Sequence, residues 1–216
     1  MYYSGGERAE KGVAIVVDKS IVRSVVTKIV YNDRIIAIQL QAELICILTM
    51  QVYMPTSEHD NDEVEELYGI IEEILEEDGK GNINTIIMVD WKSVVGEEPY
   101  RNIVGPHGLG RKNHRGQMLI NFCERNGLIV TNTWFRKPKR RLYTWKAPGD
   151  RSQHHLDYIL VRHRFRNSVK DVQTLPGADI DSDHNLLVDK ICTRLKKITR
   201  FQKRRPKWYL KKLYAQ

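Results

Sequence analysis

Three acidic or imidazole side chains stand at the ends of short apolar runs, and this pattern limits the fold of the chain more than any other feature. Asp90 ends one run, Asp157 interrupts a second, and His184 opens a third. Runs of this length that are rich in Ile, Val and Leu predict strands. Because a sheet brings the ends of its strands together, we expect Asp90, Asp157 and His184 to meet in one cleft.

The remaining runs predict a chain with more strand than helix. We expect strands near residues 12–18, 21–31, 34–41, 43–53, 84–90, 128–132, 142–146, 155–162, 169–174 and 185–192. Helices are predicted at 61–77 and 116–126. A length of 216 residues with 41% hydrophobic content is enough for one domain with a two-layer core. The pattern predicts an α+β domain in which two mainly antiparallel sheets pack face to face with helices outside.

The net charge of +8 originates at the C-terminal end of the chain. Residues 190–216 contain eleven Lys or Arg and no acid, whereas residues 1–189 hold 24 basic and 27 acidic groups, a balance of −3. Within the body, residues 58–78 contain eleven acids and no Lys or Arg, which predicts a helix with a solvated acidic face. We therefore divide the chain into a domain over residues 1–197 and a basic tail over 198–216.

A basic loop follows two aromatic residues near position 135. Arg136, Lys137, Arg140 and Arg141 lie in it, and aromatic residues flank it on both sides. Positive charge interleaved with aromatic rings suits phosphates and unstacked bases. The alternative interpretation is an ordinary solvated loop.

Two carboxylates and an imidazole in one cleft indicate a particular chemistry. Carboxylate oxygens are the ligands that hard cations such as Mg²⁺ prefer, and a histidine titrates near neutral pH. Metal-assisted hydrolysis of a phosphodiester requires both kinds of group. Taken singly, each residue also has an ordinary explanation: Asp90 as a strand-end cap, or His184 as a surface histidine.

Five short blocks, taken in order, resemble the endonuclease/exonuclease/phosphatase superfamily. They are Gln-Val-Tyr-Met-Pro at 51–55, Val-Asp-Trp-Lys at 89–92, Leu-Tyr-Thr-Trp at 142–145, Leu-Asp-Tyr-Ile-Leu at 156–160 and Ser-Asp-His at 182–184. Within the superfamily, the chain resembles the apurinic-type endonuclease domain of non-LTR retrotransposons. The resemblance implies a DNase I-like four-layer α/β/β/α sandwich, Mg²⁺ as cofactor, DNA as partner, and a nuclear location.

The resemblance also implies roles for the acidic residues and the histidine. His184 would contact the scissile phosphate, and Asp157 would orient its imidazole through a charge-assisted hydrogen bond. Asp90 would align or deprotonate the attacking water. Asp183, together with Asp90, would hold Mg²⁺.

Supporting roles are implied for three further residues. Tyr53 and Thr144 would hydrogen-bond to phosphate or to groups near the strands, and Ser182 would support the loop before His184. The adjacent pair His154 and His155 is not expected to bind a metal together, because neighbouring residues on a strand point to opposite faces.

Two departures from the family pattern predict impaired cleavage. The family's first block carries a catalytic asparagine and a metal-binding glutamate, and residues 1–6 resemble sequence that follows it, so we expect an N-terminally truncated domain. The family also has asparagine where this chain has Lys92. An ammonium there would take the position of the cation or hold the substrate phosphate unproductively, and its single charge polarises water less than a divalent metal does.

Three hypotheses follow. The first is a Mg²⁺-dependent endonuclease-like domain with weak or no activity. The second is a non-catalytic nucleic-acid or chromatin-binding module that uses the basic tail and loop. The third is an intact enzyme whose N-terminal portion lies outside this sequence. An intracellular location is expected, because the charged residues near Met1 predict no signal peptide and no apolar run is long enough to cross a bilayer.

Overall fold

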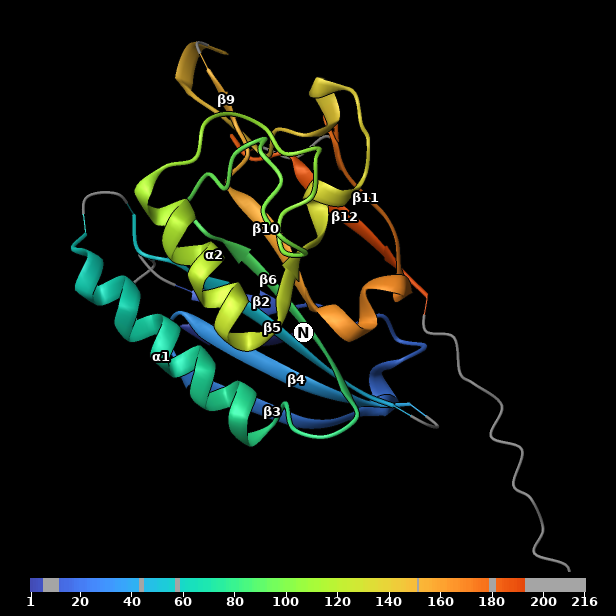
Figure 1. Cartoon of the computed structure of the whole chain (residues 1–216). Helices are drawn as coiled ribbons and strands as arrows, with labels where there is room; N and C mark the ends of the chain where they lie inside the picture. Colours follow the sequence, from blue (N-terminus) through green and yellow to red (C-terminus); the bar gives the residue numbers. More distant parts are fainter. Residues whose placement is uncertain (6–11, 43–44, 57–58, 151, 179–181, 193–216) are drawn as a thin grey trace, which may run out of the picture.

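A single mixed sheet forms the centre of the molecule in the computed structural model, which describes residues 1–192 except 6–11, 43–44, 57–58, 151 and 179–181 (Figure 1). Its strands, in spatial order, are β3 (Val25–Asn32), β4 (Ile35–Gln41), β5 (Cys46–Tyr53), β6 (Ile83–Asp90), β10 (Asp157–Arg162) and β7 (Leu128–Val130). β5 and β6 run parallel, and the other neighbouring pairs are antiparallel. The parallel register places the last residues of β5 and β6 at the same edge.

Both α-helices cover one face of this sheet (Figure 1). α1 (Asn61–Glu77) follows the cap residue Asp60, and its apolar positions recur at three- and four-residue spacing. α2 (His114–Asn126) begins after Asn113, whose side chain accepts a hydrogen bond from the N–H of Gly116, and it ends at Gly127 with φ of 61°. Three stacked aromatic residues, Tyr68, Trp91 and Phe122, join the helices to the sheet.

The opposite face of the sheet carries two separate hairpins. One pairs β1 (Tyr2–Gly5) with β2 (Gly12–Ile15), and the other pairs β11 (Val169–Leu175) with β12 (Leu186–Ile191). The first packs against the apolar side chains that β4 turns away from the helices, and the second packs against those of β10. The predicted α+β class, with packed and mainly antiparallel β layers and helices outside, is confirmed.

Element boundaries differ from the sequence prediction in a few places. The strand predicted at 21–31 begins at Val25, because Val22–Ser24 forms a 3-10 helix. The predicted strand at 142–146 shrinks to β8 (Trp145–Lys146), which pairs with the unpredicted β9 (Gln153–His154). The remaining 3-10 helices are Thr131–Trp134, Lys139–Arg141, Pro148–Asp150 and His163–Ser168.

The predicted domain boundary at residue 197 and the basic tail lie outside the described residues. In the described part of the chain, no helix is both long and apolar enough to cross a membrane.

Candidate functional site

The ends of β6 and β10 bring two carboxylates together with the histidine. Asp90 and Asp157 are register partners across the antiparallel pair, and Tyr53 is the partner of Asp90 on its other side. His184 arrives from the segment before β12, where it forms a bridge with Trp145. Its Nδ1 lies 2.9 Å from Asp157 Oδ2, and its Nε2 lies 3.8 Å from Asp90 Oδ2. The ligand atoms of Asp90, Asp157 and His184 all lie within 4.8 Å of one another, so the convergence expected from the sequence is present.

Lys92 places an ammonium group directly on this cluster. Its backbone has a positive φ of 49°, which is rare for a residue with a side chain, and its N–H donates to Asp90 Oδ1 at 3.3 Å. The turn directs the side chain back over the strand end, where Nζ lies 2.5 Å from Asp90 Oδ2. Both side chains are largely buried, at 21% and 16% exposed. A positive charge therefore already sits at one of the two carboxylates that a metal would use.

The charges of the cluster shift the pKa values of its members. Burial and the neighbouring carboxylate of Asp157 raise the pKa of Asp90, against the opposing effect of Lys92. Burial is the largest single effect on the pKa of Lys92 and lowers it, but the hydrogen bond to Asp90 and the negative charges of Asp90 and Asp157 together raise it by more, so that the pKa of Lys92 is raised. The hydrogen bond to Asp157 raises the pKa of His184, although burial and Lys92 oppose it. The two acids and the two basic groups thus largely balance each other's charge.

Two buried side chains hold the start of β10 in place. Thr144 is fully buried, and its Oγ1 accepts hydrogen bonds from the N–H groups of Leu156 at 2.9 Å and Asp157 at 3.0 Å. Asn132 donates to the carbonyl of Asp157 at 3.0 Å and accepts from the N–H of Ile159 at 3.0 Å. Thr144 therefore contacts the strand, which is one of its two predicted roles, and does not face the cleft. Asn132 was not predicted, because its partners lie more than 20 residues away and no local pattern marks it.

Asp183 forms a contact of its own outside the Asp90, Asp157 and His184 group. Its Oδ2 accepts a hydrogen bond from Trp145 Nε1 at 2.7 Å, and it is absent from the group of described side chains that could share a metal. The described side chains group Asp90 with Asp157 and His184, and a metal-binding role for Asp183 beside Asp90 stays a prediction. Ser182 Oγ accepts from the N–H of His184 at 3.1 Å, and its supporting role stays a prediction.

The basic loop is partly tied to the β11–β12 hairpin. Lys137 Nζ lies 2.5 Å from a carboxylate of β11, and Arg141 Nη1 donates to an amide oxygen of the same strand at 2.8 Å. Arg136 and Arg140 are exposed. Two of the four predicted phosphate-binding residues are therefore available to solvent at this surface, while the other two fasten the loop.

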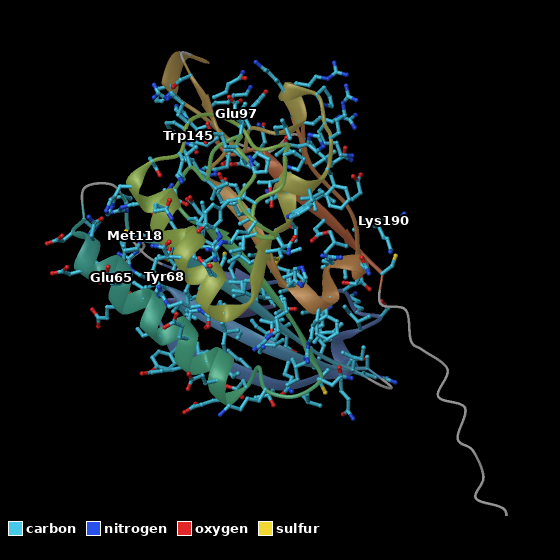
Figure 2. The ribbon with its side chains drawn as sticks, viewed as in Figure 1. Glu65, Tyr68, Glu97, Met118, Trp145 and Lys190 are labelled. Atoms are coloured by element: carbon cyan, nitrogen blue, oxygen red, sulfur yellow. The ribbon has the colours of Figure 1, made fainter. Side chains whose placement is uncertain are left out.

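A hollow of about 810 Å³ opens beside the cluster, between the loop after β6 and the β8–β9 hairpin. Lys92, Arg111, Trp145 and His154 are among its lining residues, and Trp145 lies at the end of the molecule where β9 stands (Figures 1 and 2). His154 rests against the Trp145 ring. His155 is buried and meets Asn132 at 3.1 Å, and burial lowers its pKa to about 4. The two adjacent histidines thus have different partners.

Known proteins resemble this chain both in sequence and in fold. No family model matches the chain. Craniofacial development protein 2 of Bos taurus is 39% identical over 197 residues, which are 91% of this chain and 33% of that protein, and the Tragulus javanicus protein of the same name is 38% identical over the same length. The chain spans about a third of the length of the curated relatives it matches.

Among solved structures, the endonuclease domain of TRAS1, a telomere-specific non-LTR retrotransposon, superimposes with a TM-score of 0.55 at 16% identity, covering 77% of this chain and 66% of that chain. An endonuclease/exonuclease/phosphatase family protein from Leptotrichia buccalis gives a TM-score of 0.50 at 22% identity, covering 73% and 53%. The chain has the endonuclease/exonuclease/phosphatase fold. The resemblance predicted from the five blocks is confirmed, and in this chain four of those blocks meet at the sheet edge that carries the Asp90 cluster.

Proposed function

We propose that this chain is an endonuclease-like domain that binds DNA phosphodiesters, uses Mg²⁺ only weakly, and cleaves poorly or not at all. The observation that carries the proposal is the Lys92 ammonium 2.5 Å from Asp90 Oδ2, inside a cluster otherwise suited to phosphodiester chemistry. The solved structures of similar fold include nucleases, which supports phosphodiesters as the ligand class.

The side chains of the cluster have distinct parts in this proposal. Asp157 holds the His184 ring through Nδ1, so that Nε2 is left to donate a hydrogen bond to a phosphate oxygen. The raised pKa of His184 favours the imidazolium, which strengthens that bond. Asp90 is the acceptor nearest to Nε2, and in a cleaving enzyme it would accept a proton from water. Here Lys92 competes for the same oxygen.

The ligand atoms of the cluster are of the type that Mg²⁺ binds, but the positive charge of Lys92 disfavours the ion. Two carboxylates and an imidazole would hold the ion, which when bound supplies Lewis-acid stabilisation of the phosphate. Lys92, however, already neutralises Asp90 and would repel a divalent cation placed at the same oxygen. We therefore propose that Mg²⁺ binds weakly and that DNA binding does not require it.

A second candidate function is a non-catalytic nucleic-acid or chromatin-binding module in the nucleus. The exposed Arg136 and Arg140 and the basic composition of residues 193–216 favour it. It differs from the first proposal in the residues that bind the nucleic acid: the basic loop and tail take the place of the cleft around Asp90 and His184.

Metal titration of the unmodified chain tests the main proposal. Mg²⁺ is added while the His184 ring signals are followed by NMR, and binding of a short DNA duplex is measured by fluorescence anisotropy with and without Mg²⁺. We expect millimolar or weaker Mg²⁺ affinity, DNA binding that is independent of Mg²⁺, and tighter Mg²⁺ binding by Lys92→Met. The matched control Lys170→Met, an exposed lysine of β11, should leave Mg²⁺ affinity unchanged. Micromolar Mg²⁺ affinity in the unmodified chain would contradict the proposal, and DNA binding lost in His184→Ala would favour the cleft over the second candidate.

A further inference from the structure

A second hollow, of about 310 Å³, opens at the outer edge of the central sheet, where β7 is the last strand. The segment after β7, which forms one wall, packs beside β11 (Figure 1). Among the described residues, none lines both this hollow and the one beside the Asp90 cluster. Small-ligand pockets have volumes of about 300–1,000 Å³, so this one suits a ligand of modest size. We call it the Trp134 hollow, and its lining includes Asn102, Ile129, Trp134, Phe135, Arg166 and Asn167.

The Trp134 hollow combines buried apolar side chains with an exposed indole. Ile129 of β7 and Val169 of β11 are 4% and 7% exposed, and Phe135 packs against the apolar cluster of β10 and β11. Trp134 is 38% exposed, although its Nε1–H donates to the carbonyl of Ile103 at 3.4 Å. This hydrogen bond holds one edge of the ring and leaves part of the indole open to a ligand. An exposed ring of this kind can stack on a planar group.

Two side-chain amides also line the Trp134 hollow. Asn102 and Asn167 are exposed, and within the described part of the chain neither side chain forms a hydrogen bond with another residue. An amide supplies a donor and an acceptor together. The edge of a nucleobase requires both, as in the two hydrogen bonds that Asn forms with adenine. A planar ring with hydrogen-bonding edges therefore matches the hollow better than a purely apolar group.

The segments that frame the hollow are strongly basic. Residues 128–149 and 158–170 contain six and four Lys or Arg, respectively, and no Asp or Glu. Arg136, which directly follows Phe135, and Arg166 are both exposed. Arg166 contacts His163 through Nη1 at 2.9 Å, and a guanidinium has further N–H donors that this contact does not use. Basic segments without acids attract phosphate groups.

We propose that the Trp134 hollow binds an unpaired base of single-stranded nucleic acid. The base stacks on the indole of Trp134, and its edge meets the amides of Asn102 and Asn167. Arg136 and Arg166 contact the flanking phosphates. A base within a duplex cannot enter, because its faces are covered by its neighbours and its pairing edge is occupied.

This inference builds on the nucleic-acid binding proposed above and adds a ligand class and a place for it. The Asp90 cluster is proposed to take a duplex phosphodiester, whereas the Trp134 hollow takes a base from a single strand. An apolar peptide side chain is a poorer match, because it would leave both amides without hydrogen bonds and the arginines without a counter-charge. DNA and RNA single strands share the required chemistry, so the experiment compares them.

Binding of short oligonucleotides to the full 216-residue chain tests the inference. A labelled oligothymidylate of about 10 nucleotides, the matching oligouridylate, and a stable abasic analogue of the same length are compared by fluorescence anisotropy. The abasic strand keeps the phosphates but lacks the bases, so we expect it to bind about tenfold more weakly than the oligothymidylate. This comparison needs no variant of the chain to fold. Of the deoxyribose and ribose strands, the one that binds more tightly identifies the source of the base.

Variants of the hollow locate the contact. Trp134→Leu should weaken oligothymidylate binding about tenfold, whereas Trp134→Phe keeps an aromatic ring and should retain most of the affinity. The matched control Tyr3→Leu removes a ring of β1 that is 63% exposed, and it should change nothing. Arg166→Gln should reduce the slope of log K against log salt by about 0.7, the value for one single-strand phosphate. Hydrogen exchange should show protection of residues 128–135 and 163–170.

Four results would overturn the inference. The first is equal affinity for the abasic strand and the strands that carry bases, which would leave only backbone contacts. The second is unchanged affinity in Trp134→Leu, and the third is protection confined to the hollow beside the Asp90 cluster. The fourth is no binding of either single strand, which would point to a peptide as the occupant.

Duplex DNA measured in parallel separates this inference from the proposed function. Duplex binding that persists while single strands bind without regard to Trp134 contradicts this inference alone. Single-strand binding that depends on Trp134, without any duplex binding, contradicts the proposed function alone.

Discussion

At the scale of single residues, a few neighbouring side chains determine the charge of the cluster formed by Asp90, Asp157 and His184. Asp90 lies between Lys92 at 2.5 Å and His184 at 3.8 Å, and Asp157 holds the other side of the imidazole at 2.9 Å. Removing any one of these groups leaves a buried charge without its partner, which costs more than a surface ion pair contributes. The residue-scale predictions therefore concern charge and hydrogen bonding.

The stabilising effect of His184 should fade at high pH. Its pKa is raised in the folded chain by the hydrogen bond to Asp157, so the contribution of the imidazolium is fully present below the unfolded value near 6.5 and is lost as pH rises through the folded pKa. His184→Gln should reduce the free energy of unfolding more at pH 6 than at pH 9. Urea unfolding at both values measures this, with exposed His114→Gln as the control. An equal loss at both pH values would show that the ring acts through packing alone.

Removing the hydroxyl of Thr144 should damage β10 out of proportion to its size. Thr144→Val leaves the N–H groups of Leu156 and Asp157 buried without an acceptor, which costs about 1–3 kcal/mol per group in protein mutational data. Thr144→Ser keeps the acceptor and is expected to lose much less. Chemical denaturation compares the two variants, and NMR shows whether the Asp157–His184 hydrogen bond survives. Similar losses for both would mean that the hydroxyl contributes no more than the methyl group does.

At the scale of elements, β12 combines an open edge with a buried acid. Because the pKa of Asp189 is raised to about 7, the folded state holds its proton through a range in which the unfolded state has lost it. The stability from the protonated form is full below about pH 4 and decreases as pH rises toward 7. Asp189→Asn should therefore raise the melting temperature at pH 8 but not at pH 4. A variant that is less stable than the unmodified chain at pH 8 would indicate a favourable partner for the carboxylate.

Local pattern was sufficient for most elements but not for all contacts within the site. The periodicity of residues 61–77 and the apolar run before Asp90 predicted α1 and β6 well, because the side of an element that is buried determines which nearby residues are apolar. β9 is two residues long and exists through its pairing with β8, so no run marks it. The metal-binding role of Asp183 was expected from the family resemblance of residues 182–184, and it stays a prediction. Adjacent side chains in an extended segment point apart, and Asp183 meets Trp145.

At the scale of the whole molecule, the excess positive charge is concentrated at the C-terminal end of the sequence. Ten of the eleven basic residues from 190 onward lie in residues 193–216, whereas Lys190 belongs to β12. Deletion of residues 193–216 should lower both the affinity for duplex DNA and its salt dependence. Each lost phosphate contact should reduce the slope of log K against log salt by about 0.9. Anisotropy titrations at several salt concentrations measure this slope, and an unchanged slope would assign the contacts to Arg136 and Arg140.

The central claim is that Lys92 makes the Asp90, Asp157 and His184 cluster a phosphate-binding site with little cleaving power. Nicking of supercoiled plasmid DNA in the presence of Mg²⁺ tests it most directly, with His184→Ala as the reference for contaminating nuclease. The account predicts that the unmodified 216-residue chain converts no more plasmid to the open-circular form than His184→Ala does. Robust Mg²⁺-dependent nicking that disappears in His184→Ala would contradict the account and identify an active nuclease.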